Sequence, residues 1–161
     1  MAGNLRIAGL TLTRQSRPPT PSHSYLAVAQ SLIRGVDCFP EDGGPTNSAH
    51  AFLCSHIAEC VLKAYAAHMG LSDKALSASN VRHNLVELWT QAAAQGLGVE
   101  PEAPEWIEQL NFLHDHPFYM RYLKGIDSFS VPNPQPIRHE LKRLLALVVA
   151  ALPPNPSRVH E

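Results

Sequence analysis

The segment from Thr46 to Met69 constrains the fold most strongly, because its apolar residues recur with the period of an α-helix. The spacing between successive members of the stripe is four, four, three and four residues, which places them on one helical face. Phe52, Cys60 and Tyr65 widen this face, and Gly70 follows in a position typical of a helix end. We therefore predict a long central helix whose stripe is Leu53, Ile57, Val61, Ala64 and His68.

Further helical patterns flank this segment, separated by turns rich in proline and glycine. They predict an all-α fold, an antiparallel bundle of about five helices, with a short strand or a disordered arm before it. We expect residues 1–21 to form an N-terminal arm or linker, 22–153 the bundle and 154–161 a mobile tail. The other four helices are expected from about Ser22 or Ser24 to Gly35, from about Ser79 or Asn80 to Gly96, from Pro104 to about Gly125 with a bend at Pro117, and from Pro136 to Leu152.

Composition narrows the classes of function. The formal net charge is −1, so the sequence lacks the basic excess typical of proteins that bind nucleic acid tightly and without specificity. Its three cysteines include no CxxC pair, and Cys54 and Cys60 are expected to be buried in a reduced protein. No segment approaches the roughly 18 apolar residues of a membrane span. We therefore expect a cytoplasmic protein without membrane contact.

Three stretches, in this order, resemble the HEPN family of helical nucleotide-binding domains. Residues 51–65 (AFLCSHIAECVLKAY) are similar to the long second helix of that family, including Glu59 and Lys63. Residues 83–89 (HNLVELW) resemble its His-Asp-Leu helix start, with Asn84 in place of aspartate, and residues 118–122 (FYMRY) resemble its arginine-tyrosine stretch. The resemblance spans about residues 22–152. It implies a helical bundle, a homodimer, and either RNA cleavage or partnership with a nucleotidyltransferase in a toxin–antitoxin-like pair.

The sequence departs from the ribonuclease members of that family, which carry an arginine followed four to six residues later by a histidine. After Arg121, the corresponding window holds Ile126, Asp127 and Ser128 and no histidine. Arg17 and His23 match the spacing, but Arg17 lies in the proline-rich linker. We therefore predict a binding module for a nucleotide, RNA or a protein partner, and assign no catalytic residue.

The predicted ligand-binding residues are Glu59, Lys63, His83, Arg121 and Tyr122. Arg121 and Lys63 would hold phosphate, Tyr122 would stack or donate a hydrogen bond, and His83 with Glu59 would orient the group. Each residue also has a structural interpretation. Glu59 and Lys63 are spaced as an ordinary i, i+4 ion pair, His83 could support a helix start, and Arg121 could bind a neighbouring carboxylate.

The nine histidines suggest a metal site, but their spacing does not define one. His56 with Glu59, and His83 with Glu87, share helix faces without identifiable further ligands, and the groups of His114-Asp115-His116 would diverge in a helix. We therefore predict no metal and no cofactor. Two alternatives stay open: a divergent metal-independent ribonuclease that uses Arg121 and His83, and a structural or adaptor homodimer without a small ligand.

Overall fold

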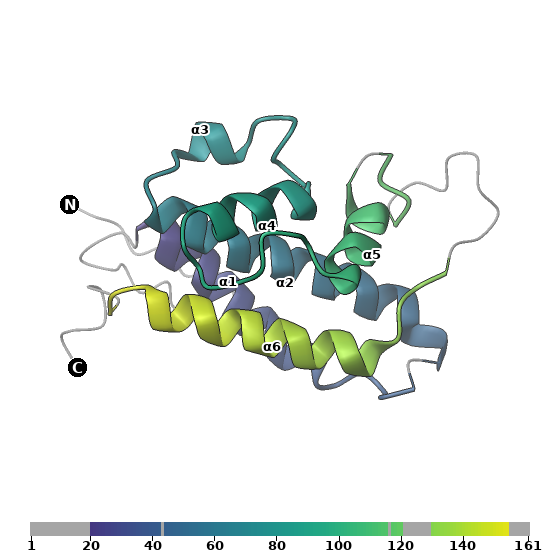
Figure 1. Cartoon of the computed structure of the whole chain (residues 1–161). Helices are drawn as coiled ribbons and strands as arrows, with labels where there is room; N and C mark the ends of the chain where they lie inside the picture. Colours follow the sequence, from purple (N-terminus) through teal and green to yellow (C-terminus); the bar gives the residue numbers. More distant parts are fainter. Residues whose placement is uncertain (1–19, 43, 116, 121–129, 155–161) are drawn as a thin grey trace, which may run out of the picture.

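The computed structural model describes residues 20–42, 44–115, 117–120 and 130–154, and within these ranges it is an all-α bundle without strands (Figure 1). This confirms the predicted fold class. The expected N-terminal strand or arm falls outside the described residues, as does most of the expected tail. The elements are α1 (Pro21–Val36), the short 3₁₀ helix η1 (Gly44–Thr46), α2 (Asn47–His68), α3 (Asp73–Leu76), α4 (Leu85–Ala94), α5 (Glu105–His114) and α6 (Pro134–Ala151).

Helix α2 is the centre of the bundle, as the sequence predicted. It packs against α1, α4, α5 and α6, and every residue from Ile57 to Ala66 is buried. Because successive helical residues are rotated by about 100°, ten consecutive buried residues mean that all sides of this part of α2 are covered. The predicted stripe was therefore too narrow in this part of α2, where the buried surface includes the charged residues Glu59 and Lys63. The predicted face was wrong nearer the helix ends, where Phe52 and His68 are exposed.

The helix starts differ from the prediction where side chains outside the apolar pattern determine them. Helix α1 begins at Pro21 after Thr20, whose hydroxyl accepts a hydrogen bond from the His23 backbone N–H at 3.4 Å, so the cap is Thr20 and not a serine. Helix α4 begins only at Leu85, because residues 79–83 form turns and Asn84 is the cap. The short α3 was not predicted.

The second half of the chain forms α5 and α6. Helix α5 ends at His114, and residues 117–120 form a turn, so the described residues do not continue as the expected bent helix. Residues 121–129 lie outside the described ranges. Helix α6 begins two residues before the expected Pro136, and its buried residues include Ile137, Leu141, Leu144 and Val148.

Cys54 and Cys60 are buried and free, which confirms the expectation for both, and Cys38 is free and exposed. Burial raises the pKa of the Cys54 thiol to about 12 and that of the Cys60 thiol to about 11. Both are therefore protonated at neutral pH and unsuited to nucleophilic chemistry. Within the described residues, no helix is long and apolar enough to cross a membrane.

Candidate functional site

A buried carboxylate, Glu59, lies at the centre of the only group of three or more close histidine, cysteine or acidic side chains among the described residues. Glu59 is 6% exposed and lies midway along α2. One helical turn later, Lys63 is 5% exposed, and its Nζ donates to Glu59 Oε1 at 2.6 Å. The predicted i, i+4 pair therefore exists, but in the core, where the small stabilisation typical of surface pairs does not apply.

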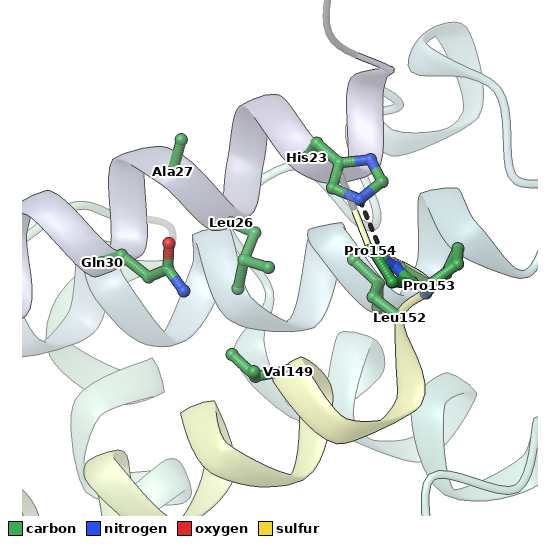
Figure 2. Close-up of a pocket in the computed structure, with 8 residues that line it drawn as sticks. All are labelled: His23, Leu26, Ala27, Gln30, Val149, Leu152, Pro153 and Pro154. Atoms are coloured by element: carbon green, nitrogen blue, oxygen red, sulfur yellow. Dashed lines mark hydrogen bonds between the residues drawn. The ribbon is translucent and has the colours of Figure 1, made fainter. Parts of the chain in front are cut away.

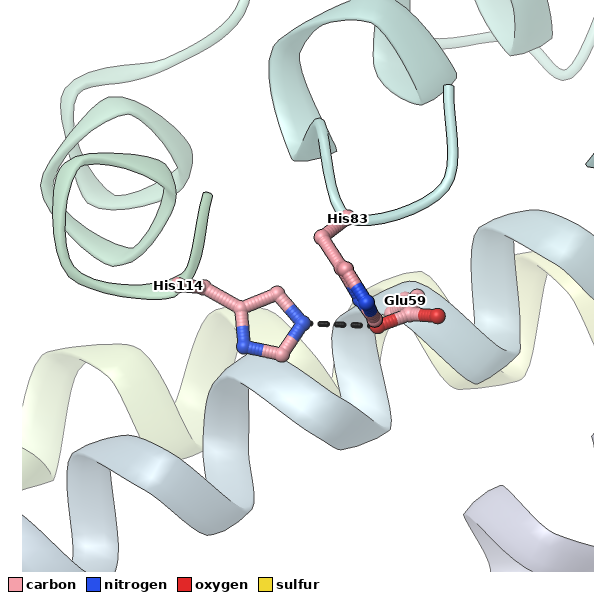
Figure 3. Close-up of side chains that lie close together, drawn as sticks. All are labelled: Glu59, His83 and His114. Atoms are coloured by element: carbon pink, nitrogen blue, oxygen red, sulfur yellow. Dashed lines mark hydrogen bonds and ion pairs between the residues drawn. The ribbon is translucent and has the colours of Figure 1, made fainter. Parts of the chain in front are cut away.

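Two histidines donate to the other carboxylate oxygen. His83, in the turn before α4, places Nδ1 at 3.1 Å from Glu59 Oε2, and His114, the last residue of α5, places Nε2 at 2.6 Å from the same oxygen. Figure 3 shows both rings directed at Glu59 from different elements. The His83 and His114 rings also contact each other edge to face, with centroids 5.4 Å apart. Three elements therefore converge on one carboxylate.

Further hydrogen bonds fix the turn that carries His83. Lys63 Nζ donates to the backbone oxygen of Arg82 at 2.7 Å, which uses a second N–H of the ammonium group. Asn84 Oδ1 accepts from the Glu87 N–H at 2.9 Å, and Asn111 Oδ1 from α5 accepts from the Leu85 N–H at 2.6 Å. The start of α4 is therefore anchored to both α2 and α5.

The carboxylate is ionised despite its surroundings. Burial alone would raise the pKa of Glu59, but the hydrogen bonds from His114 and Lys63, the positive charge of Lys63 and the hydrogen bond from His83 outweigh it. Together they lower the pKa of Glu59 to about 2. At neutral pH Glu59 is therefore a carboxylate with hydrogen-bond donors on both oxygens, and the Lys63 ammonium group balances its negative charge.

Phe118 borders the cluster with a strained backbone. It is the one described non-glycine residue with positive φ, at 65°, and its ring meets the His83 ring edge to face at 5.6 Å. A bulky residue in the left-handed region is uncommon, and such strain tends to occur near functional sites. The first residue of the predicted 118–122 stretch is thus in contact with the cluster.

Glu59, Lys63 and His83 are thus three of the five predicted ligand-binding residues, and they lie together. Arg121 and Tyr122 lie outside the described residues. Sequence reasoning missed His114 as a partner of Glu59, because 55 residues separate the two in the chain and no local spacing links them. The sequence singled out His114 only as part of His114-Asp115-His116, whose spacing did not define a site.

No protein-family model matches the chain, and no curated protein or solved structure is similar enough to it to count as a match. The HEPN resemblance therefore stays a prediction from the three stretches.

A separate cavity of about 300 Å³ lies between α1 and the end of α6 (Figure 2). His23 borders it, with Nε2 donating to the Pro153 carbonyl at 3.0 Å and Nδ1 lying 2.6 Å from the Thr20 hydroxyl. Since a carbonyl can only accept, Nδ1 of the neutral ring is the acceptor for Thr20. Both ring nitrogens are hydrogen-bonded, so His23 fastens α1 to the end of α6.

Proposed function

We propose that this protein is a HEPN-like binding module that recognises a phosphate-bearing ligand, a nucleotide or RNA, without cleaving it. One observation supports the proposal above the others. Glu59 and Lys63 belong to one of the three stretches that resemble the family, and His83 belongs to another. In the structure these residues meet in one buried cluster. Residues 118–122, the third stretch, begin at the edge of that cluster with Phe118.

A cluster of this kind is costly, which argues for a role beyond stability. Charged groups in a core are often no more stabilising than apolar side chains of similar volume. Here the cluster fixes the turn before α4 and the end of α5, and the His83 ring contacts Phe118 at the start of the third stretch. Since Lys63 already donates two hydrogen bonds, we assign phosphate contact mainly to Arg121, with Tyr122 beside it. A guanidinium group can donate two parallel hydrogen bonds to phosphate.

The first test is native mass spectrometry of the tag-free protein purified gently from its own cells. A bound nucleotide or oligoribonucleotide is the expected result. A bare homodimer would instead favour the adaptor alternative, and a co-purifying nucleotidyltransferase without a nucleotide would favour recognition of a protein partner. Each of these two outcomes would overturn the proposal that the ligand bears a phosphate group.

The second test is calorimetric titration with ATP and with a single-stranded RNA. Arg121→Ala should weaken binding by about 10-fold or more, since a hydrogen bond to a charged group contributes roughly 1.5–3 kcal/mol. Arg143→Ala is the matched control, because Arg143 is exposed on α6 and pairs only with Glu140 among the described residues. Equal affinities of the two variants would contradict the assignment of Arg121. Cleavage of the RNA in the presence of a chelator, lost in His83→Ala, would favour the ribonuclease alternative.

A further inference from the structure

The side chains around Glu59 also have the composition of a metal site. The coordinating atoms of Glu59, His83 and His114 all lie within 4.8 Å of one another. They come from the middle of α2, the turn before α4 and the end of α5, so only the folded bundle assembles them. Two imidazole nitrogens and one carboxylate oxygen are the protein ligands of many open zinc sites.

From this geometry, we propose that Glu59, His83 and His114 bind one divalent transition-metal ion, such as Zn²⁺, and leave a coordination position open. The inference does not depend on the phosphate-bearing ligand proposed above. It rests on the convergence of three ligand atoms, two of them on buried side chains, and not on any spacing in the sequence.

The distances require only a small adjustment. Ligand atoms around a tetrahedral zinc lie about 2.0–2.2 Å from the ion and hence roughly 3.4 Å from one another. In the structure, Glu59 Oε2 lies 2.6 Å from His114 Nε2 and 3.1 Å from His83 Nδ1. The rings therefore need to move outward by less than about 1 Å to admit the ion. His83 is the most exposed of the three side chains, at 17%, and marks the side from which an ion can enter.

Binding changes the positions of protons. Each imidazole now donates a hydrogen to Glu59 and would instead offer that nitrogen's lone pair to the metal. The hydrogen of a neutral ring then moves to its other nitrogen. For His114 this is the buried Nδ1, which has no hydrogen-bond partner among the described residues. Lys63 meanwhile occupies the other carboxylate oxygen, so Glu59 binds through Oε2 alone.

These features predict a moderate affinity. A ligating histidine normally donates its second N–H to an acceptor, and loss of that support typically weakens binding 10- to 100-fold. The ammonium group of Lys63 adds electrostatic repulsion close to the ion. We therefore expect a dissociation constant in the micromolar range, well above the values of closed structural zinc sites.

The experiment is calorimetric titration of the tag-free, chelator-treated full chain with Zn²⁺, followed by Co²⁺ and its visible absorption spectrum. One equivalent of Zn²⁺ should bind, and Co²⁺ should give the intense bands of a four-coordinate ion. His83→Ala and His114→Ala should each weaken binding at least 10-fold, whereas His139→Ala, which removes an exposed histidine of α6, should not change it.

His114 is almost fully buried, so circular dichroism must first show that its variant folds. His83→Gln gives a second variant at the more exposed ligand and should weaken Zn²⁺ binding in a protein that keeps its helices. Absence of Zn²⁺ binding by the wild type would overturn the proposal. So would a dissociation constant that is the same in His83→Gln, His139→Ala and the wild type.

Discussion

Two ion pairs in this protein have the same length but different surroundings. Lys63 Nζ lies 2.6 Å from Glu59 Oε1, with side chains 7% and 8% exposed, and Lys142 Nζ lies 2.6 Å from Asp37 Oδ1, with side chains 49% and 50% exposed. The exposed pair is screened by water, whereas each partner of the buried pair compensates the charge of the other. Burial, not distance, should therefore determine how much each pair matters for stability.

Replacement of each lysine by methionine tests this difference. We expect Lys63→Met to lower the free energy of unfolding by about 3–5 kcal/mol, because Glu59 loses its compensating charge in the core. Lys142→Met should lower it by less than about 1 kcal/mol. Urea unfolding followed by circular dichroism measures both. Similar losses in the two variants would show that the core around Glu59 is well hydrated.

At this scale the sequence predicted part of the site. The spacing of Glu59 and Lys63 identified the pair, and the HNL stretch identified His83, because both signals are local. The burial of the pair and the contact of His114 with Glu59 depend on how α5 packs against α2. A period read along one helix contains no information about a partner 55 residues away.

At the scale of elements, the start of α4 shows why an asparagine suits position 84. Its side chain caps α4 by accepting from the Glu87 N–H, and an aspartate can do the same. Asn111 adds a second acceptor from α5, at the Leu85 N–H. The predicted start at Ser79 or Asn80 was wrong. The apolar pattern continues through the turn before α4, and only these hydrogen bonds define where the helix begins.

We expect Asn84→Ala to lower the free energy of unfolding by about 1 kcal/mol, since the cap is lost. Asn84→Asp should retain wild-type stability, because aspartate caps equally well and its charge suits the helix N-terminus. Thermal and urea unfolding of the two variants give the comparison. If the aspartate variant were as unstable as the alanine variant, repulsion between the new aspartate and the negative charge of Glu59 would outweigh the stabilisation by the cap.

At the scale of the whole molecule, the cluster links the stability of the bundle to pH. The pKa of Glu59 is lowered from an ordinary value of 4.5 to about 2 in the folded protein. A lowered pKa means that the ionised form stabilises the fold above pH 4.5 and that this stabilisation is lost as the pH falls toward 2. The full contribution of ionised Glu59 to the free energy of unfolding corresponds to about 3 kcal/mol.

The free energy of unfolding of the metal-free protein should therefore fall steeply between pH 4.5 and 2. The double variant Glu59→Gln with Lys63→Met removes both charges of the pair and should show a flatter profile over the same interval. Other carboxylates contribute equally to both proteins, so the difference in slope is the measured quantity. Parallel profiles would mean that Glu59 titrates normally.

The overall architecture was the most predictable level. Apolar periodicity identified α2 and the helical class. The period is a property of many residues together, so a few residues that depart from it do not change the prediction. It did not identify α3, which is too short to show a period, or the complete burial of α2 between Ile57 and Ala66. That burial follows from the number of helices that surround α2, which no single segment encodes.

The hydrogen bond between His23 and the Pro153 carbonyl brings the first turn of α1 next to the end of α6. The start of α1 and the end of α6 are therefore adjacent in space, although His23 and Pro153 are 130 residues apart in the chain. A short peptide joining them would allow a circular permutant, reopened at the exposed turn around Gly70, to keep every helix in place. The packing of the helices would therefore be compatible with more than one order of the helices along the chain.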